Sequence, residues 1–469
     1  MRSTSAAIAV RVGTVNEFEI LRLSALEQGA MIRSGFLSSE ELTELYLRRI
    51  AAHDGEYSAF VQVLADEARR TARRADRRNP PPDAPLYGVP IAIKDLNAVR
   101  GAFMRMGSRA FSRLLVPADD LVVARLRRAG LIFVGKTATS ELGALPVTEP
   151  DIHPPTRNPW DARVTAGGSS GGSGAAVAAD LVPFAQGSDG GGSVRIPASL
   201  CGIVGFKPSR GIVENPFGMR QPDIIWTCGP LARSVDDAAA LLDAMTDRGA
   251  DGAGFLERSR MPLRSLRVRY ATEVHVVKTT DDAKAAVERA AEILAGLGHQ
   301  VEPHPQLSGA DIDDFLPIWQ QAVANVPVAD WELTQPVTRW LREAGKHLDR
   351  RQVSAKIGSI SERVLAVFGD ADVWLTPTVA VEPTPIGAWR NLLPDEVFRR
   401  AAELGAFTAP FNMSGQPAIS IPATLSSQGH PIGVQIVGRC GDDVTVLALG
   451  RLLEQAFGWR GLASRPRAA

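Results

Sequence analysis

The sequence predicts an α/β protein: one large α/β/α domain with a mixed, twisted central sheet covered by helices on both faces. Three observations support this prediction. Segments with helical spacing alternate with short apolar segments typical of buried strands. No linker or internal repeat divides the 469 residues. Apolar residues make up 45% of the chain and charged residues 22%, which is typical of globular proteins and excludes disorder or coiled coil for the bulk.

Residues 1–80 are predicted to be a helical N-terminal region. Ser38 and Glu41 have the spacing of a capping box, and apolar residues follow on one helical face at Leu42, Leu45, Tyr46 and Ile50. The helical pattern ends at the run Asn79-Pro80-Pro81-Pro82, because proline lacks the backbone N–H and restricts φ. We interpret this region as scaffold.

Residues 84–240 form the predicted core, and the elements after it continue the alternation. A buried strand over residues 88–93 ends on the charged pair Lys94-Asp95, and a helix ending near Gly130 leads into a strand over 131–134. Further on, a helix over 283–297 leads into a strand over 300–304. Residues from about 305 to 368 read as a helical cap with tryptophans at 319, 331 and 340, and 369–469 as the C-terminal part of the same domain.

Charge and cysteine content exclude several classes of function. Lys+Arg and Asp+Glu both number 52, so the formal net charge is zero and neither nucleic acid nor a membrane surface is expected as a partner. Three cysteines cannot form a disulfide framework, and no metal-binding spacing occurs, so we expect no metal and no cofactor. The apolar stretch of residues 6–10 is too short for a signal peptide, and a cytoplasmic location is expected.

Two motif matches conflict with their surroundings. Residues 130–137 fit the phosphate-loop pattern G-x-x-x-x-G-K-[ST], but the intervening Leu-Ile-Phe-Val is typical of a strand whose N–H groups are already paired. Residues 167–171 fit the nucleophile-elbow pattern G-x-S-x-G, but residues 158–166 before it read as a loop instead of a strand. His430 is the one late histidine that could serve such a site, and we interpret it as a loop residue.

A serine- and glycine-rich block at residues 167–193 is the strongest functional signal. Two glycine clusters flank an apolar helix over 174–179, which a flexible linker would lack. Ordered glycines in a row indicate unusual backbone geometry or N–H groups that approach a ligand. The N–H groups before Ser193 would suit a developing oxyanion.

This block resembles the signature of the amidase signature family of serine hydrolases. The matching segments are Gly-Gly-Ser169-Ser170-Gly-Gly-Ser and Gly-Ser188-Asp189-Gly-Gly-Gly-Ser193-Val-Arg195-Ile-Pro. Further matches run along nearly the whole chain, at residues 87–95, 135–143, 158–161, 229–236 and 412–422. The resemblance implies the family's α/β fold and hydrolysis of a carboxamide C–N bond.

The resemblance also assigns roles to residues. It makes Ser193 the nucleophile, Ser169 an intermediate serine after a cis Gly168–Ser169 peptide, and Lys94 the base. The oxyanion would be held by N–H groups of Gly190, Gly191, Gly192 and Ser193, with support for the site from Ser170, Ser188, Asp189 and Arg195.

The chemistry of these residues can be argued independently. A serine hydroxyl is a weak nucleophile that needs a base, and with no histidine nearby a neutral lysine is the remaining candidate. The pKa of Lys94 must therefore fall, and its apolar strand supplies the burial that lowers it. An acyl-enzyme on Ser193 would follow, and some esterase activity is expected.

The sequence departs from many relatives at one position, where Gly190 stands in place of Thr. We predict that this opens room for a bulky acyl or aryl group, as in relatives resembling nylon-oligomer hydrolases, so that anilides, carbamates (urethanes) and oligo-amides are preferred to simple amides. Leu142, Gly143 and Trp226 are the predicted pocket residues.

Two alternatives remain open. One is the glutaminase-type A subunit of a tRNA-dependent amidotransferase, although Ile196 and residues 223–228 differ from the usual pattern of that subunit. The other is a catalytically silent binding scaffold. A free-standing hydrolase, acting on a small-molecule amide or carbamate as a monomer or homodimer, is the favoured hypothesis.

Overall fold

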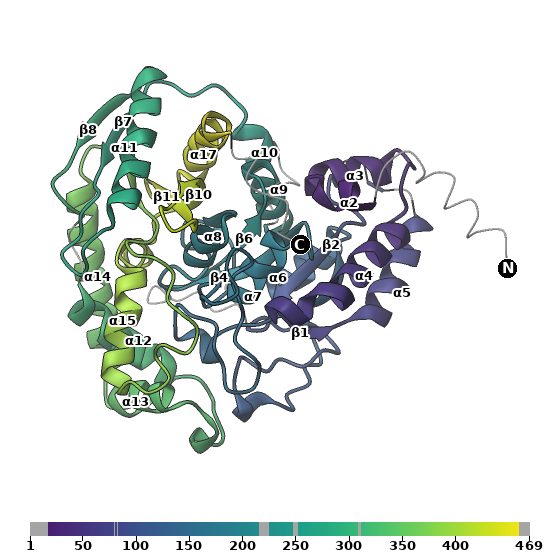
Figure 1. The fold of residues 1–469 in the computed structure, drawn as a ribbon, viewed down its shortest axis with the longest axis horizontal. Helices are drawn as coiled ribbons and strands as arrows, with labels where there is room; N and C mark the ends of the chain where they lie inside the picture. Colours follow the sequence, from purple (N-terminus) through teal and green to yellow (C-terminus); the bar gives the residue numbers. More distant parts are fainter. Residues whose placement is uncertain are drawn as a thin grey trace.

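The computed structural model describes residues 17–78, 80–81, 83–214, 225–246, 252–307 and 311–458. An 11-stranded sheet runs through this part of the chain in the order β1-β3-β2-β4-β6-β5-β10-β11-β9-β7-β8 (Figure 1). The strands are β1 (Phe60–Val63), β2 (Pro90–Lys94), β3 (Ile132–Thr137), β4 (Phe184–Asp189), β5 (Val204–Lys207), β6 (Thr227–Ala232), β7 (Arg267–Tyr270), β8 (Gln300–Pro303), β9 (Val373–Pro377), β10 (Ala418–Leu425) and β11 (Pro431–Gly438).

The sheet is mixed, as predicted. Strands β3, β2 and β4 are parallel neighbours, the central pairs from β4 to β9 are antiparallel, and β9, β7 and β8 are again parallel. The parallel pairs are joined by helical crossovers, which explains why strand and helix patterns alternate along the sequence.

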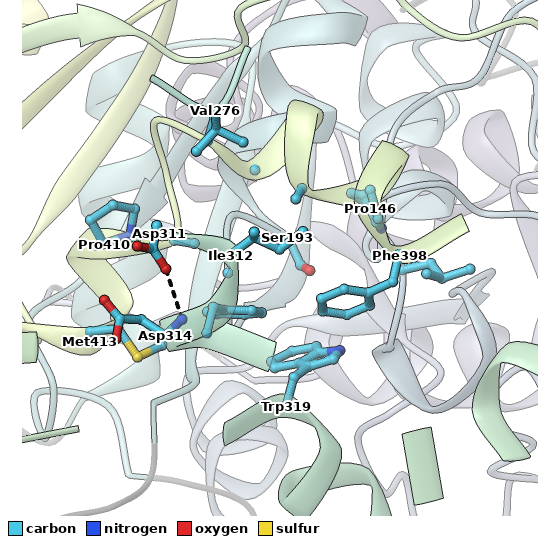
Figure 2. A pocket seen from close by; sticks show the side chains of 18 of the residues that line it. Pro146, Ser193, Val276, Asp311, Ile312, Asp314, Trp319, Phe398, Pro410 and Met413 are labelled. Atoms are coloured by element: carbon cyan, nitrogen blue, oxygen red, sulfur yellow. Dashed lines mark hydrogen bonds between the residues drawn. The ribbon is translucent and has the colours of Figure 1, made fainter. Parts of the chain in front are cut away.

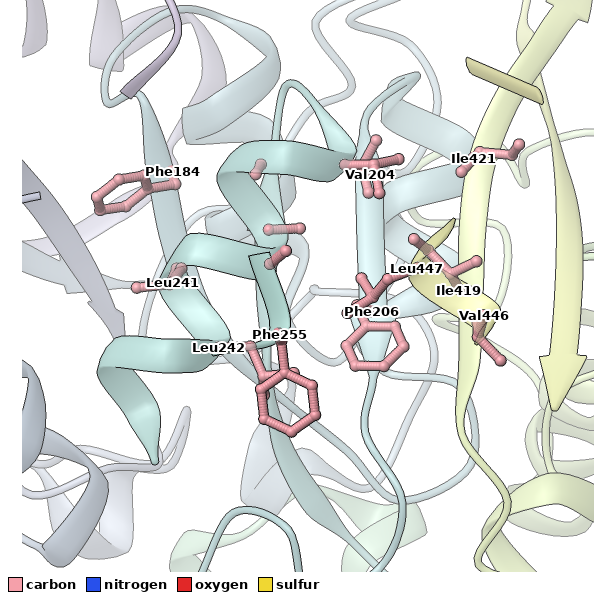
Figure 3. Packing of buried hydrophobic residues seen from close by; sticks show 14 of the residues in the cluster. Phe184, Val204, Phe206, Leu241, Leu242, Phe255, Ile419, Ile421, Val446 and Leu447 are labelled. Atoms are coloured by element: carbon pink, nitrogen blue, oxygen red, sulfur yellow. The ribbon is translucent and has the colours of Figure 1, made fainter. Parts of the chain in front are cut away.

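Helices cover both faces of the sheet. One face carries α4 (Ser39–Tyr57), α5 (Ala65–Asp76), α7 (Gly171–Ala178) and α8 (Arg195–Cys201), and the other carries α3 (Ala25–Arg33), α6 (Leu121–Arg128), α9 (Val235–Met245), α11 (Asp281–Gly296) and α17 (Asp443–Phe457). Side chains alternate between the two cores: Ile91 and Ile93 pack on the second face, whereas Ala92 packs on the first. Figure 3 shows the second core, where Phe206 packs between α9 and α17.

A group of helices lies at one side of the sheet and forms a cap. It comprises α12 (Ile312–Ala324), α13 (Pro336–Gly345), α14 (Arg350–Phe368), α15 (Pro394–Gly405) and α16 (Pro410–Met413) (Figure 1). Helices α12, α13 and α14 lie within residues 305–368, the segment predicted to be a helical cap, and a short 3₁₀ helix, η5 (Trp331–Leu333), lies between α12 and α13. The C-terminal helices α15 and α16 complete the cap, and the sequence patterns did not indicate this.

Several local predictions are confirmed. Ser38 and Glu41 form the capping box of α4, and the predicted strand beginning at Gly88 is β2, which ends on Lys94. The phosphate-loop match lies in β3, so its backbone is paired in the sheet and Lys136 bonds Asp95 at 2.7 Å. The N-terminal region is not entirely helical, however, because Phe60–Val63 pairs with β3 as an edge strand.

The remaining short helices are α2 (Glu17–Arg22) and α10 (Phe255–Arg258). Within the described ranges, no helix combines the length and apolar character that a membrane span requires. The candidate site lies at the carboxyl ends of the parallel strands β2 and β4, which are neighbours in the sheet: β2 ends on Lys94, and β4 belongs to the serine–glycine block and leads to Ser193. Ligands of α/β sheets bind at such strand ends.

Candidate active site

Lys94, the last residue of β2, is fully buried at this edge of the sheet. Its backbone N–H donates to Gln186 Oε1 at 3.1 Å, which fixes the end of β2 against β4. Its Nζ lies 2.7 Å from Ser169 Oγ, 3.0 Å from Ser188 Oγ and 3.3 Å from the Ser188 carbonyl oxygen. The amine is therefore held by three oxygen atoms from two segments of the serine–glycine block.

Burial lowers the pKa of Lys94 to about 7, because an ammonium ion without water around it is destabilised, and the negative charge of Asp189 offsets only part of this effect. A substantial fraction of the amine is consequently uncharged near neutral pH. The sequence argument required such a shift, and the apolar strand that precedes Lys94 provides it.

Ser169 and Ser170 come immediately before α7, and the Gly168–Ser169 peptide bond is cis, as predicted. Ser170 joins this segment to the next one. Its N–H donates to the carbonyl oxygen of Ser193 at 3.2 Å, and its hydroxyl donates to the carbonyl oxygen of Ser188 at 3.2 Å. The two halves of the serine–glycine block are thus hydrogen-bonded side by side.

Ser193 lies between the end of β4 and the start of α8, and it lines a cavity. Within the described part of the chain its hydroxyl has no hydrogen-bond partner, unlike the hydroxyl of Ser169. The structure therefore brings Lys94 and Ser169 into direct contact, with Ser193 on the neighbouring loop and open toward the cavity.

A buried ion pair holds the loop that carries Ser193. The carboxylate of Asp189 accepts hydrogen bonds from Arg195 Nε at 2.9 Å and Nη2 at 2.8 Å, and both residues are fully buried. Arg195 continues to Gln435 Oε1 at 2.7 Å and Asn412 Oδ1 at 2.6 Å, so the loop is anchored to β11 and α16. Burial would raise the pKa of Asp189, but the Arg195 guanidinium holds it well below its usual range.

The predicted oxyanion donors divide into two groups. Gly192 is a wrong prediction, because its N–H donates to Asp189 Oδ1 at 2.8 Å and is already used in holding the loop. The N–H groups of Gly190, Gly191 and Ser193 have no hydrogen-bond partner among the described residues, so they stay available for a ligand. A glycine-rich motif alone cannot say which N–H group turns inward.

The cavity at Ser193 is enclosed by the loop after β3 and by the cap, and it holds about 780 Å³ of empty space that includes its open mouth. Figure 2 shows Ser193 facing the same space as Trp319 and Phe398. The lining is largely apolar and comprises Gly143, Ala144, Leu145, Pro146, Gly191, Ser193, Ile196, Val276, Asp311, Ile312, Asp314, Phe315, Trp319, Ile360, Phe398, Ala401, Ala402, Gly405, Ala406, Ala409, Pro410 and Met413.

Of the predicted pocket residues, only Gly143 lines this cavity. Leu142 packs instead in an apolar cluster with the cap helices, and Trp226 packs in a cluster with α14 and α16. Phe315 and Phe398 also line the cavity and were not among the predicted pocket residues. The spacing of Phe315 and Trp319 places both on one face of α12, a signal that could have been used.

The prediction that Gly190 opens room for the substrate is also wrong. A Cβ atom at Gly190 would lie 3.0 and 3.1 Å from two ring atoms of Trp319. The space that a larger side chain would occupy is filled by the indole of the cap.

The nucleophile-elbow match at residues 167–171 is not joined by His430, the histidine considered for it. His430 lies in the turn between β10 and β11 and bonds Glu382 at 2.7 Å, away from the serines. Among the residues that the structure describes, no group of three His, Cys, Asp or Glu side chains is arranged to hold a metal ion.

Comparison with known proteins shows the family of this chain. The sequence model of the family described as Amidase matches residues 41–447, which is most of the chain. The chain belongs to the amidase signature family. It is accordingly an amidase, an enzyme that hydrolyses amide C–N bonds, and its α/β fold is the fold of that family.

Individual relatives of this amidase agree along most of their length. The chain is 35% identical over 483 residues to a 6-aminohexanoate-cyclic-dimer hydrolase of Pseudomonas sp., covering 94% of this chain and 96% of that protein. It is 33% identical over 460 residues to an acylamidase of Rhodococcus erythropolis, covering 93% and 96%. The solved structure of a 6-aminohexanoate cyclic dimer hydrolase complexed with substrate superimposes with a TM-score of 0.86 at 32% identity, covering 95% of this chain and 99% of that one.

Proposed function

We propose that this amidase cleaves its substrate through an acyl-enzyme on Ser193, with Ser169 and Lys94 as the proton relay. The observation that carries the proposal is the 2.7 Å contact between Lys94 Nζ and Ser169 Oγ, made by a buried amine whose pKa is lowered to about 7. A neutral amine has two N–H bonds and one lone pair. The two oxygens of Ser188 can accept the N–H bonds, which leaves the lone pair for the Ser169 hydroxyl.

The proposed cycle moves one proton along this relay. Lys94 takes the proton of Ser169, Ser169 takes that of Ser193, and Ser193 Oγ forms a bond to the carbonyl carbon. The free N–H groups of Gly190, Gly191 and Ser193 stabilise the oxyanion. The proton then returns to the leaving nitrogen as the C–N bond breaks, and a water molecule attacks the resulting ester under the same base.

The preferred substrates are amides with an apolar acyl or aryl group. Support comes from the cavity beside Ser193, where aromatic side chains stack and few polar groups are present. The similarity to an acylamidase and to a cyclic-dimer hydrolase points in the same direction. Carbamates and esters present the same kind of carbonyl group to Ser193, so we propose both as further substrates of the same site. We also propose that the chain acts without a partner subunit.

Covalent labelling tests this proposal. Phenylmethylsulfonyl fluoride should inactivate the purified chain and add one sulfonyl group to the peptide that contains Ser193, as measured by mass spectrometry. Ser193→Ala should abolish labelling, whereas Ser427→Ala, a matched change at an exposed serine in the β10–β11 turn, should leave it intact.

A second assay compares substrates. The chain alone, without other subunits, should hydrolyse benzoyl p-nitroanilide faster than acetamide. Absence of labelling would favour a silent scaffold. Labelling with hydrolysis of glutamine only in the presence of partner subunits would favour the amidotransferase subunit.

A further inference from the structure

Trp319 connects the cap to both walls of the catalytic site. Its indole Nε1–H donates to the carbonyl oxygen of Ala144 at 2.9 Å, on the loop after β3. The opposite edge of the ring lies against Gly190, in the loop that leads from β4 to Ser193. Trp319 also stacks on Phe315, with ring centroids 5.2 Å apart, so its position is fixed from three sides.

The indole can lie this close to residue 190 because glycine has no side chain. A Cβ there would lie 3.0 and 3.1 Å from the indole, closer than ordinary van der Waals contact, whereas the next neighbour, Trp226 Cβ, would lie at an ordinary 3.4 Å. The φ angle of Gly190 is not in the left-handed region, so alanine could adopt this backbone without strain. The indole is therefore the obstacle to a larger residue at this position.

The adjacent glycine repeats the arrangement with a different partner. A Cβ at Gly191 would lie 3.1 Å from Cζ of Phe315, and its φ is likewise not in the left-handed region. Two consecutive residues of the loop that carries the predicted oxyanion donors thus each lie against one aromatic side chain of α12.

The loop held by the indole reaches the relay. Ala144 follows Gly143, where an added Cβ would lie 3.4 Å from Ser169 Oγ. A movement of Trp319 would therefore shift the cavity wall at Gly190 and the wall near Ser169 together. Protein interiors transmit such shifts because they are close-packed.

From these contacts we infer that Trp319 is a specificity-determining and positioning residue, which limits the size of the acyl group and, paired with Gly190, holds the loop of the oxyanion donors in place. This inference rests on the proposed function, since it assumes that the acyl group bound to Ser193 occupies this cavity. The indole, instead of an open space beside Gly190, sets the boundary of the acyl site.

A double-mutant cycle tests the pairing. The variants are Gly190→Ala, Trp319→Leu and the combination, assayed on benzoyl and acetyl p-nitroanilide so that only the acyl group differs. Trp319→Leu should raise the benzoyl-to-acetyl ratio of kcat/KM by about tenfold, at the lower end of the range for discrimination by a hydrophobic pocket. Gly190→Ala should lower kcat on both substrates by about tenfold, and the combination should recover most of that loss, as residues in contact commonly show coupling of this size.

A matched cycle supplies the control. Gly191→Ala should also lower kcat. Phe315→Leu should restore most of this loss of kcat, whereas Trp319→Leu should not. A general loosening of the cap would relieve both glycine variants alike, so the pattern of relief separates pairing from a structural defect. Thermal unfolding of each variant verifies that it folds.

Three outcomes would overturn the inference: Gly190→Ala with unchanged kcat, a double variant whose losses simply multiply, or a benzoyl-to-acetyl ratio of kcat/KM that Trp319→Leu leaves unchanged. The rate of Ser193 sulfonylation is measured in the same variants. If Ser193 of the chain without substitutions is not labelled, the proposed function is refuted. If labelling and hydrolysis are intact but Trp319→Leu does not restore the activity lost in Gly190→Ala, only the role of Trp319 is refuted.

Discussion

The catalytic centre and the cap cavity of this amidase are built in opposite ways. At the centre, Asp189, Arg195 and Asn412 are fully buried and joined by directional hydrogen bonds. In the cap, Phe315, Trp319 and Phe398 meet through stacked rings, and Trp319 contributes one hydrogen bond.

The two regions should therefore tolerate different substitutions. A buried charge that loses its partner is strongly destabilising, because neither water nor a neighbour replaces the lost bonds. An apolar side chain can be exchanged for another of similar size at small expense in stability. We therefore expect single substitutions at the centre to cause large losses of stability or activity. Substitutions in the cap should change substrate selectivity in small steps.

The largest expected effect is at the nucleophile. Ser193→Ala should reduce kcat by about 10³- to 10⁶-fold, because members of a catalytic unit act together. Steady-state hydrolysis of a chromogenic anilide measures it. Residual activity of more than about a tenth of the original, once contaminating hydrolases are removed, would contradict the assignment of Ser193.

The next effect tests the polar network. Asp189→Asn leaves the buried Arg195 without its carboxylate and should lower the free energy of unfolding by about 3–5 kcal/mol. Urea unfolding followed by tryptophan fluorescence measures the loss. Asp282→Asn, at a partly exposed site that bonds Ser427, is the matched control and should change stability by less than about 0.5 kcal/mol.

A smaller effect comes from pH. The base must be neutral, so kcat/KM should rise with pH through an apparent pKa of about 7, the pKa of Lys94. Activity at about pH 6 should then be about a tenth of that at about pH 8. A flat profile over this range would rule out Lys94 as the group that controls the rate, and Lys94→Met should remove the dependence along with most of the activity.

The smallest effect is expected in the cap. Phe398→Leu should change KM for benzoyl p-nitroanilide by about threefold and lower stability by less than about 1.5 kcal/mol. Leu393→Ala, at a side chain 70% exposed beside the same helix, should change neither quantity. If Phe398→Leu abolished turnover, the contrast between the two regions would be wrong.

The sequence predicted the centre better than the cap. The placement of Lys94 at the end of a buried strand follows from the apolar run before it, which is local information. The bonded pair of Lys94 and Ser169 likewise agrees with the roles that the motif resemblance implied, although those roles stay predictions until they are tested.

The errors arise where distant segments meet. The effect of Gly190 depends on Trp319, which is far away in sequence, so no local pattern could show that the space was already filled. The N–H of Gly192 was misassigned because its partner, Asp189, is set by loop geometry. Trp226 and Leu142 were predicted to line the pocket, but helix packing directs them into other clusters.

The separation of these segments along the chain bears on recombination between genes. Lys94, Ser169 and Ser193 all precede β5, whereas the aromatic residues of the cap follow β8. A hybrid protein with a crossover between β6 and α12 would take Lys94, Ser169 and Ser193 from one parent and the aromatic residues of the cap from the other. Such hybrids require compatible residues at 190 and 319, so these two positions should be exchanged as a unit when libraries of chimeric amidases are assembled.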